Sequence, residues 1–467
     1  MGVRIYDSKL RKVVPLDTRA DGRVAMYCCG PTVYNYIHVG NARTMVWFDQ
    51  IRRYLAYRGY DVTYVMNYTD VDDKIIERAN LEGLPPDGIT SKYTKAFEED
   101  MAALGATPAD VICRATDHIP HMVEAIEGLI DNGLAYEANG NVWFAVEKFA
   151  DYGSLSGRSL DDMRAGERVE PSEHKRHPLD FALWKSAKED EPSWPSPWGS
   201  GRPGWHIECS VMSTKYLGMG FDVHGGASDL IFPHHENELA QAEGLAGTAP
   251  FARHWMHAGL VQIDAEKMSK SLGNFVLAHD LLSRYDGEVV RYWILAGSYR
   301  SQASFTEESL DDARSSYGRW KTFAESVRHA LGGDVPAEAG ADDPYEARFV
   351  EAMDDDLNSA AAFAVVHDLV KEGNKALAGG DEQRDDLVRL AGTFGELTGV
   401  LGFRFPVAED ASGVVEGLLD FLLEMREEAR AEKAYARADS IRDRLASLGV
   451  TIEDTSAGPR WRLGGTA

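Results

Sequence analysis

The apolar positions at the start of the chain follow two patterns in turn. Apolar runs over residues 23–27 and 61–67 have the length and composition of buried strands. The first run leads through a Gly/Pro turn to apolar residues whose spacing predicts a helix beginning near residues 38–41. After the second run, residues 69–79 open another helix. Strand–turn–helix units repeated in this way predict a parallel sheet and an α/β fold.

Further along, the strand and helix patterns separate. Residues 118–130 carry a helical apolar stripe, and residues 140–146 and 257–263 are predicted to be strands. From about residue 307 the apolar spacing is helical. Residues 331–344 are rich in Gly, Pro and acidic residues, so we expect a flexible acidic connector there. The carboxyl-terminal third is therefore expected to be mainly helical.

Composition narrows the class of protein. The chain has 467 residues, 44% of them hydrophobic, so about three domains of ~100–200 residues are expected. It contains no run of ~18 apolar residues, and its first residues lack the apolar stretch of a secretory signal, so we expect no membrane span. Four cysteines are too few for a disulfide framework at this length, which favours a reducing, cytoplasmic setting.

The turn after the first predicted strand carries several reactive or hydrogen-bonding side chains. Residues 28–44 read CCGPTVYNYIHVGNART and include a thiol at Cys29 and polar side chains at His38 and Asn41. Folds of this class bind nucleotides where a strand feeds a helix, because free amides at the helix N-terminus face the phosphates. This stretch is therefore our first candidate for a nucleotide site.

Two short motifs resemble the signatures of class I aminoacyl-tRNA synthetases. HVGN at residues 38–41 resembles their HIGH motif, with Asn41 replacing its last histidine, and KMSKS at residues 267–271 matches the second motif without departure. CGPTVYNYIHVGNART resembles the first motif of the cysteinyl-tRNA synthetases, and NYTDVDDKII resembles their second block. The resemblance covers nearly the whole chain. It implies a class I Rossmann-like nucleotide-binding catalytic domain with an inserted domain, then a helical bundle and a small C-terminal anticodon-binding domain.

Four side chains form a candidate metal site. His234 and Glu238 are four residues apart, so on a helix they share one face. Together with Cys29 and Cys209 they offer S, S, N and O donors, a set suited to tetrahedral zinc. This spacing alone is not specific for zinc. The resemblance implies one Zn²⁺ per chain at these residues, because the cysteinyl family uses these four positions as ligands.

The remaining cysteines and nearby histidines receive other roles. Cys28 and Cys113 match no ligand position and are predicted to be core residues. His206, His224 and His235 have suitable chemistry for ligands, but we expect them to line or support the pocket.

The resemblance also implies the reaction and its partners. Such an enzyme activates L-cysteine with ATP to cysteinyl-adenylate and transfers it to tRNA(Cys), with zinc selecting the thiolate and Mg²⁺ accompanying the ATP. The matched motifs imply these residues: His38, Asn41, Lys267 and Lys270 in catalysis and, with Gly40 and Ser269, in ATP binding; Gly30, Thr69, Trp205 and Asp229 in the amino-acid pocket; Arg430, Asp439, Asp454 and Trp461 at the anticodon.

The resemblance further implies a division of the chain into six parts. These are the catalytic halves at residues 1–130 and 201–265, the inserted acceptor-end domain at 131–200, a KMSKS-loop junction at 266–315, the helical bundle at 316–405 and the anticodon-binding domain at 406–467. We expect the chain to act as a monomer.

Two other functions share parts of this pattern. A ligase that joins activated cysteine to an amino sugar, as in mycothiol synthesis, has HIGH-like, KMSKS-like and zinc blocks. It lacks the complete anticodon-binding end that residues 423–463 resemble. A non-catalytic zinc- and RNA-binding protein would need neither HVGN nor KMSKS. A cysteine–tRNA ligase is therefore our first interpretation.

The charge balance is strongly acidic for a protein expected to bind a polyanion. The formal net charge is −26 and the pI about 4.9, whereas phosphate neutralisation by Lys and Arg supplies much of the affinity for nucleic acid. Two explanations stay open. Acidic residues coat faces remote from the nucleic acid, or the chain is adapted to concentrated salt. Acidic clusters at residues 98–100, 354–356 and 381–382, with Arg outnumbering Lys, favour salt adaptation.

Salt adaptation predicts that dialysis into dilute buffer loosens the fold. At 1 M salt the Debye length of ~3 Å screens the repulsion between carboxylates, and this screening is lost when the salt is removed. We expect circular dichroism and cysteine-dependent pyrophosphate exchange to decline together as salt is removed. Unchanged spectra and activity in dilute buffer would contradict salt adaptation and favour acids placed away from the nucleic acid.

Overall fold

The computed structural model describes residues 2–160, 163, 174–189, 191–263, 266–267, 276–340, 343–406, 411–455 and 458–463. The chain forms two compact units, Met1–Arg404 and Phe405–Ala467. Within the described residues, no helix is long and apolar enough to cross a membrane. The finer six-part division expected from the sequence stays a prediction.

A five-stranded parallel sheet forms the centre of the first unit, as the two strand–turn–helix repeats predict. Its order is β11-β10-β3-β4-β5, and each neighbouring pair is parallel. The strands are β3 (Arg23–Cys28), β4 (Asp61–Tyr68), β5 (Val111–Arg114), β10 (Phe221–Ala227) and β11 (Ala252–Ala258). Because β10 lies beside β3, residues about 200 positions apart in sequence meet at the carboxyl ends of these two neighbouring strands.

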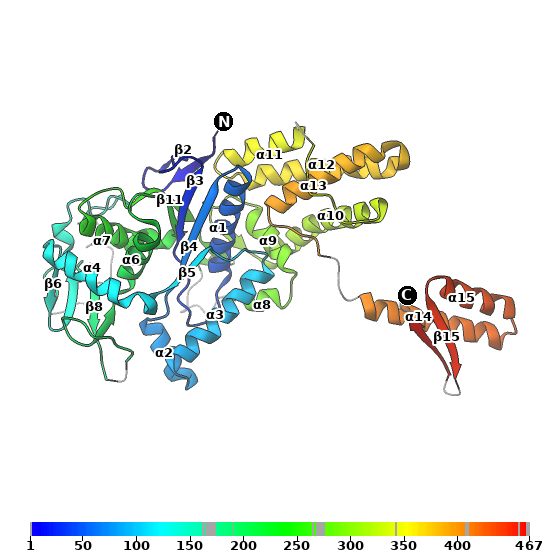
Figure 1. Cartoon of the computed structure of the whole chain (residues 1–467), viewed down its shortest axis with the longest axis horizontal. Coiled ribbons are helices and arrows are strands. Elements are labelled where there is room, and N and C mark those ends of the chain that lie inside the picture. The colour runs from blue at the N-terminus through cyan, green and yellow to red at the C-terminus, as the bar shows by residue number, and fades with distance from the viewer. Residues whose placement is uncertain are drawn as a thin grey trace. The chain divides into compact units, whose positions relative to one another are not determined.

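Helices cover both faces of the sheet (Figure 1). Helix α1 (Val39–Tyr57) packs on one face, and its apolar run places Val46, Trp47 and Phe48 in the core. Helix α6 (Trp205–Leu217) packs against β3 and β4, with α4 (Ile119–Asp131) and α7 (Glu236–Ala246) beyond it. On the same face as α1, α3 (Pro86–Ala103) and α9 (Gly287–Leu295) pack against that helix, whereas α6 covers the opposite face. The central sheet is therefore buried on both sides, as continuous apolar strands require.

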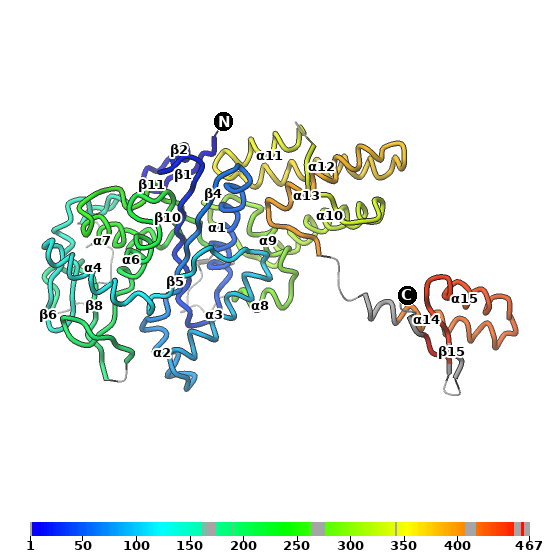
Figure 2. The backbone as a smooth tube through the Cα atoms, in the orientation of Figure 1, coloured from blue at the N-terminus to red at the C-terminus, as the bar shows by residue number. Residues whose placement is uncertain are grey.

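The chain leaves this sheet after β5 and returns to it at β10 (Figure 2). The intervening segment contains an antiparallel sheet of four strands, β6 (Ala135–Ala138), β7 (Asn141–Phe144), β8 (Phe181–Ser186) and β9 (Gly201–Pro203). Other short elements of the unit are β1 (Arg4–Asp7), β2 (Lys12–Pro15), α2 (Asp73–Glu82), β12 (Val261–Ile263), β13 (Glu266–Lys267), α8 (Ala278–Leu282) and β14 (Ala303–Phe305).

The strand predicted over residues 257–263 is divided in two. Strand β11 ends at Ala258 in the central sheet, whereas β12 begins at Val261 in a second sheet of order β13-β12-β14. The Gly259 amide donates to the Tyr299 carbonyl at 2.7 Å, and the Gly259 carbonyl accepts from Arg43. These partners turn the chain between the sheets, and the apolar pattern contains no signal for them.

Helices make up the remainder of the first unit, as predicted from about residue 307. They are α10 (Glu307–Leu331), α11 (Pro344–Asp354), α12 (Ser359–Gly379) and α13 (Arg384–Val400). The expected flexible connector instead packs against α13 over residues 336–339. A side chain at Gly392 or Gly395 would come within 2.2 Å and 1.9 Å of the Glu338 and Pro336 carbonyl oxygens. Glycines on α13 thus create room for this segment, which its acidic composition does not reveal.

The second unit is a small α/β structure with its own core. It contains α14 (Ala411–Ala431), α15 (Tyr435–Ser447), β15 (Val450–Thr455) and β16 (Gly458–Leu463), and the two strands form an antiparallel hairpin. Leu419, Leu445 and Val450 are buried together, and Trp461 packs against them.

Part of the acidic clusters that favoured salt adaptation is buried. Asp100, Asp354 and Asp356 are at most 9% exposed. Asp356 accepts hydrogen bonds from the Tyr6 amide, the Tyr299 hydroxyl and the Arg300 guanidinium, each at 2.7 Å. Asp356 also adopts a left-handed φ of 60° in the turn between α11 and α12. These acids hold elements together, so they do not contribute to a solvated acidic surface.

Replacing Asp356 with Ala should destabilise the first unit by about 2–4 kcal/mol, because it removes three hydrogen bonds, one to a charged group, and leaves buried donors unpaired. Urea unfolding followed by tryptophan fluorescence measures the change. Asp355→Ala is the matched control, since the Asp355 side chain is 65% exposed and its ion pair with Arg4 is 3.4 Å long. Equal destabilisation by both variants would contradict this role for Asp356.

Candidate active site and metal centre

The HVGN stretch forms the N-terminus of α1. His38 is the N-cap residue in an extended conformation, and its Nδ1 accepts a hydrogen bond from the Asn41 amide at 3.2 Å. His38, Gly40 and Asn41 are half-buried. Burial lowers the pKa of His38, although the nearby charge of Asp229 acts in the opposite direction. The structure therefore brings Asp229 to the helix N-terminus and favours a neutral imidazole there.

Gly30 lies where the carboxyl ends of three strands meet. Its amide donates to the Asn67 side chain at 2.9 Å, and the Cys29 amide donates to the Gly225 carbonyl at 3.0 Å. A side chain at Gly30 would come within 1.8 Å of the Asn67 carbonyl oxygen, so only glycine fits this approach of β3 to β4. Ligands bind at this edge in open α/β sheets.

The four predicted metal ligands meet in the buried core beside this edge. Each offers one donor atom, and the donor atoms of Cys29, Cys209, His234 and Glu238 all lie within 4.8 Å of one another. Glu238 Oε1 is 2.9 Å from His234 Nε2 and 3.3 Å from Cys29 Sγ. All four side chains are buried. The structure thus contains a Cys/His/Glu group that could hold a metal ion.

The electrostatics of this cluster favour the ionised forms of Glu238 and Cys209, whereas burial raises the pKa of the Cys29 thiol well above its usual range. Burial opposes ionisation of Glu238, but His224 and His234 outweigh it and hold the pKa of this carboxyl well below its usual range. Burial likewise raises the pKa of the Cys209 thiol, whereas hydrogen bonding with Cys29 and the proximity of His234 bring it to about 6. Glu238 and Cys209 therefore carry negative charge in this cluster, which suits a cation.

A second set of four overlaps the first and contains His224 and His235 in addition to Cys29 and Glu238. His224 Nε2 is 2.7 Å from Glu238 Oε2, and His235 Nδ1 is 2.7 Å from His257 Nε2. Both histidines are buried, and their supporting role stays a prediction. Cys28 and Cys113 are buried outside both sets.

Two amino-acid-pocket candidates adjoin the cluster. The Trp205 ring stacks on the His234 ring at a centroid distance of 4.1 Å and is 36% exposed. Thr69 is buried, and its hydroxyl donates to Glu208 Oε2 at 2.9 Å. Burial raises the pKa of the Glu208 carboxyl well above its usual range. Glu208, the neighbour of Cys209, was not singled out from the sequence, where a buried carboxyl looks like any other helical acid.

The KMSKS residues are described only in part. The backbone of Lys267, in β13, pairs with that of Gln262 in β12, and Ser269 and Lys270 lie outside the described residues. Gly40 lies in the first turn of α1, beside His38 and Asn41.

The anticodon candidates all lie in the second unit. Arg430 contacts Glu427 at 3.1 Å, Asp439 contacts Arg442 at 3.0 Å, and the Trp461 indole donates to Asp420 at 2.9 Å. Asp454 lies in β15, opposite Pro459 of β16. Sequence reasoning did not foresee these internal partners.

Arg43 is a further residue that sequence reasoning missed. It follows HVGN by two positions on α1, and its side chain is buried. Its Nη2 donates to the Ser298 and Ser301 carbonyls, each at 2.9 Å, and its Nη1 donates to the Gly259 carbonyl. Because Gly259 precedes β12, which leads toward KMSKS, Arg43 links the helix that begins at HVGN to the segment that leads to KMSKS. The sequence signal that could have revealed this role is an arginine among the apolar residues of the predicted helix after HVGN.

Fold and site together define a class I aminoacyl-tRNA synthetase. The chain matches the domain described as "tRNA synthetases class I (C) catalytic domain" over residues 15–315, a DALR domain over 348–406 and a "Cysteinyl-tRNA ligase anticodon binding domain" over 419–462. It is 48% identical to the cysteine–tRNA ligase of Desulfitobacterium hafniense (99% of this chain, 100% of that one) and 49% identical to that of Desulforudis audaxviator (95% and 96%). The chain belongs to the cysteine–tRNA ligase family, and it is a ligase that joins cysteine to tRNA.

Solved structures support the fold independently. Methionyl-tRNA synthetase of Mycobacterium tuberculosis, in complex with methionyl-adenylate, superposes with a TM-score of 0.57 at 17% identity over 81% of this chain and 89% of that one. A putative arginyl-tRNA synthetase of Campylobacter jejuni gives 0.53 at 14% identity, over 84% and 94%. The prediction of the family is confirmed, and the anticodon-binding domain favours tRNA over the amino-sugar alternative.

Replacing Arg43 with Lys should slow amino-acid activation, because one ammonium group cannot hold the three carbonyls that the guanidinium fork joins. We expect kcat of cysteine-dependent pyrophosphate exchange to fall about tenfold or more, with KM for cysteine unchanged. Arg52→Lys is the matched control, since Arg52 lies on the same helix and binds Pro108 and Asp110 away from both motifs. Wild-type kinetics for Arg43→Lys, or equal losses in the two variants, would contradict the prediction.

Proposed function

We propose that Cys29, Cys209, His234 and Glu238 hold one zinc ion, and that this ion selects cysteine. The support is the donor set, because two thiols, one imidazole and one carboxylate suit tetrahedral zinc better than a harder cation. The donor atoms gather within 4.8 Å in a buried cluster in which Glu238 is kept ionised.

The overlapping second set serves as support in this proposal. It offers only one thiol, and His224 Nε2 contacts Glu238 Oε2, whereas Cys29 and His234 face Glu238 Oε1. A histidine that holds the other oxygen of a ligating carboxylate orients it, as such outer partners do in metal sites. His206 Nδ1 lies 2.9 Å from His234 Nδ1, which similarly steadies that ring.

Zinc bound at this cluster would supply an electrophilic centre that favours the thiolate of cysteine over the neutral hydroxyl of serine. The chain's own residues shape the rest of the pocket. Trp205 stacks on His234, and the Thr69 hydroxyl donates to Glu208, the neighbour of Cys209. Residues of the cluster or beside it therefore position both of these proposed pocket residues. A dedicated partner of this kind can reject a near-isostere by ~10⁴ or more, whereas an apolar pocket supplies ~1–3 kcal/mol. No separate editing site is then required.

Activation requires positioning and charge stabilisation, because a substrate carboxylate attacks the α-phosphorus without a general base. Since His38 Nδ1 accepts from the Asn41 amide, the neutral ring carries its proton on Nε2 and presents a donor. We assign this donor and the Asn41 side chain to the phosphates. Gly40 and Ser269 would contact ATP, and Lys267 and Lys270 would neutralise the leaving pyrophosphate.

Further assignments complete the proposal. Asp229, whose charge reaches His38, would bind the substrate ammonium or a ribose hydroxyl, and Gly30 would border the amino acid. Mg²⁺ would accompany the ATP. Arg430, Asp439, Asp454 and Trp461 would contact the anticodon of tRNA(Cys). A monomer acting in the cytoplasm remains our expectation.

Replacing Cys209 with Ser tests zinc-based selection. We expect KM for cysteine in pyrophosphate exchange to rise by about 10²-fold or more, KM for ATP to stay close to the wild-type value, and bound zinc to fall below one per chain. The matched control is Cys113→Ser, because Cys113 is equally buried but contacts the Met66 carbonyl instead of the cluster.

Metal analysis of the purified, unchelated protein accompanies these assays. Equal losses of cysteine and ATP binding in Cys209→Ser would argue against metal-based selection. So would a metal-free wild-type protein that still discriminates cysteine from serine.

A further inference from the structure

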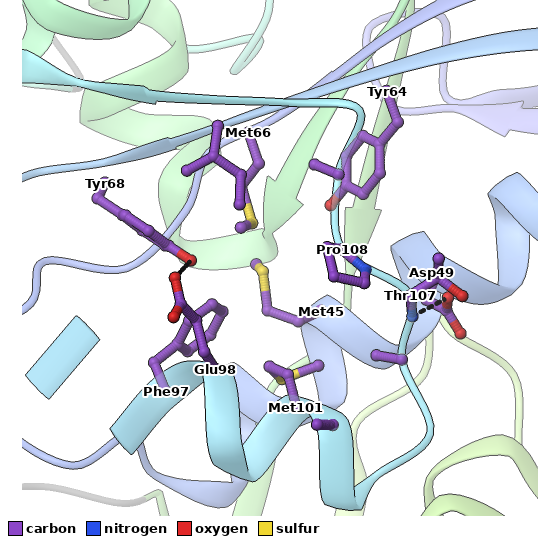
Figure 3. A pocket seen from close by; sticks show the side chains of 14 residues that line it. Met45, Asp49, Tyr64, Met66, Tyr68, Phe97, Glu98, Met101, Thr107 and Pro108 are labelled. Carbon is purple, nitrogen blue, oxygen red and sulfur yellow. Dashed lines mark hydrogen bonds between the residues drawn. The ribbon is translucent and has the colours of Figure 1, made fainter. Parts of the chain in front are cut away.

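An apolar cavity lies on the face of the central sheet away from the metal cluster. It has a volume of about 220 Å³ and is enclosed by α1, α3, strands β4 and β5, and the segment that joins α3 to β5. Figure 3 shows side chains from these elements converging on it, with Met45 of α1 facing Met66 of β4. Strand β5 is the edge of the sheet, so the cavity lies beside an edge and not within the molecule's centre.

The alternation of side chains along β4 separates this cavity from the active site. Tyr64, Met66 and Tyr68 line the cavity. Val65, between two of them, belongs to the core cluster that contains Cys29 and Cys209 on the opposite face. Because successive residues of a strand point to opposite faces, β4 presents one set of side chains to each site. The cavity is therefore a separate site that shares a wall with the catalytic machinery.

The floor of the cavity is apolar and adaptable. Met45, Met66, Met101 and Phe97 are buried there, and the rim is formed largely by Ala and Pro residues with the half-exposed Ile112. Methionine is flexible and polarisable and makes favourable contacts with aromatic rings. A dry apolar cavity of about 150 Å³ is already sufficient to bind benzene. The present cavity therefore has room for one aromatic ring with a short aliphatic chain.

The rim carries one carboxylate, Glu98, that forms no ion pair within the described residues, although the Arg114 guanidinium lies 6.0 Å from the centroid of the neighbouring Tyr68 ring. Glu98 is exposed on α3, and its single contact within the described part of the chain is the Tyr68 hydroxyl at 3.4 Å. Neighbouring acids are paired differently, since Glu99 contacts Lys95 at 3.8 Å and Asp110 pairs with Arg52. Asp49, at the other end of the cavity, is neutralised by Arg53 and Arg291. Glu98 thus places one available negative charge above an apolar cavity.

We propose that this cavity binds a small amphipathic amine, with its apolar group among the three methionines and its ammonium group against Glu98. Apolar burial supplies the affinity, and the carboxylate selects a cation over an anion of the same shape. The ligand contacts Met45, on the helix that begins at HVGN, and Tyr68, which precedes Thr69. The site belongs to the chain itself and does not depend on zinc or tRNA.

The full-length protein labelled with ¹³C-methyl methionine provides a local readout, because three of its 13 methionines line the cavity. Single Met→Leu variants assign their resonances. On titration with 2-phenylethylamine we expect saturable shifts of the Met45, Met66 and Met101 methyl groups, whereas Met353 of α11 and Met212 of α6 stay unchanged. The matched probe is 3-phenylpropionate, which has the same ring but a negative charge, and it should bind at least about tenfold more weakly.

Three variants test the assignment. Glu98→Gln should weaken 2-phenylethylamine binding about tenfold, whereas Glu99→Gln, on the same helix but outside the cavity, should not. Ala102→Trp, at an exposed rim position, should abolish the shifts while leaving the methyl resonances of Met353 and Met212 in place as a check on folding. Absence of saturable shifts, equal binding of the amine and the acid, or undiminished amine binding to Glu98→Gln would overturn the proposal.

Discussion

One buried carboxylate organises the centre of this ligase. Glu238 is excluded from solvent, yet its pKa is held well below the usual range by His224 and His234. A buried charge is costly unless it is paired, and removing one partner of a buried pair typically costs about 3–5 kcal/mol. The partners of Glu238 come from β10, from the turn before α7 and, through Cys29, from the end of β3. These segments must therefore assemble together around this group.

That requirement explains why the two sequence-distant halves of the sheet form one site. The order β11-β10-β3-β4-β5 brings β10 beside β3. Cys29 then lies against Gly225, and Gly30 lies against Asn67 of β4. Arg43 likewise joins segments that are distant in sequence. Its guanidinium donates hydrogen bonds to carbonyls of two later segments and so holds them against the helix that begins after His38. Binding geometry and fold stability thus rest on the same few polar contacts.

The acidic character of the chain has two physical origins. Asp354 and Asp356 are buried and bind tyrosine hydroxyls and arginines, so they join the helical bundle to the α1 region and to the segment between α9 and β14. Glu98, Glu99 and the acids at residues 381–382 are exposed. The net charge of −26 counts both groups alike. Only the exposed group bears on salt dependence, on tRNA repulsion and on attraction of small cations.

The sequence by itself determined the elements and motifs that depend on local patterns. Periodicity placed β3, α1 and β4, and the resemblance of HVGN, KMSKS and the cysteine and histidine blocks identified the family, because these signals lie within short stretches. Only the tertiary structure decided which of several donors share Glu238, why the strand predicted over residues 257–263 turns at Gly259, and that Arg43, Glu208 and Asp356 are buried with specific partners. It also decided that a methionine-lined cavity lies on the other face of β4. Pairing and burial between distant segments depend on how whole elements pack, and no local pattern of apolar and polar residues encodes that packing.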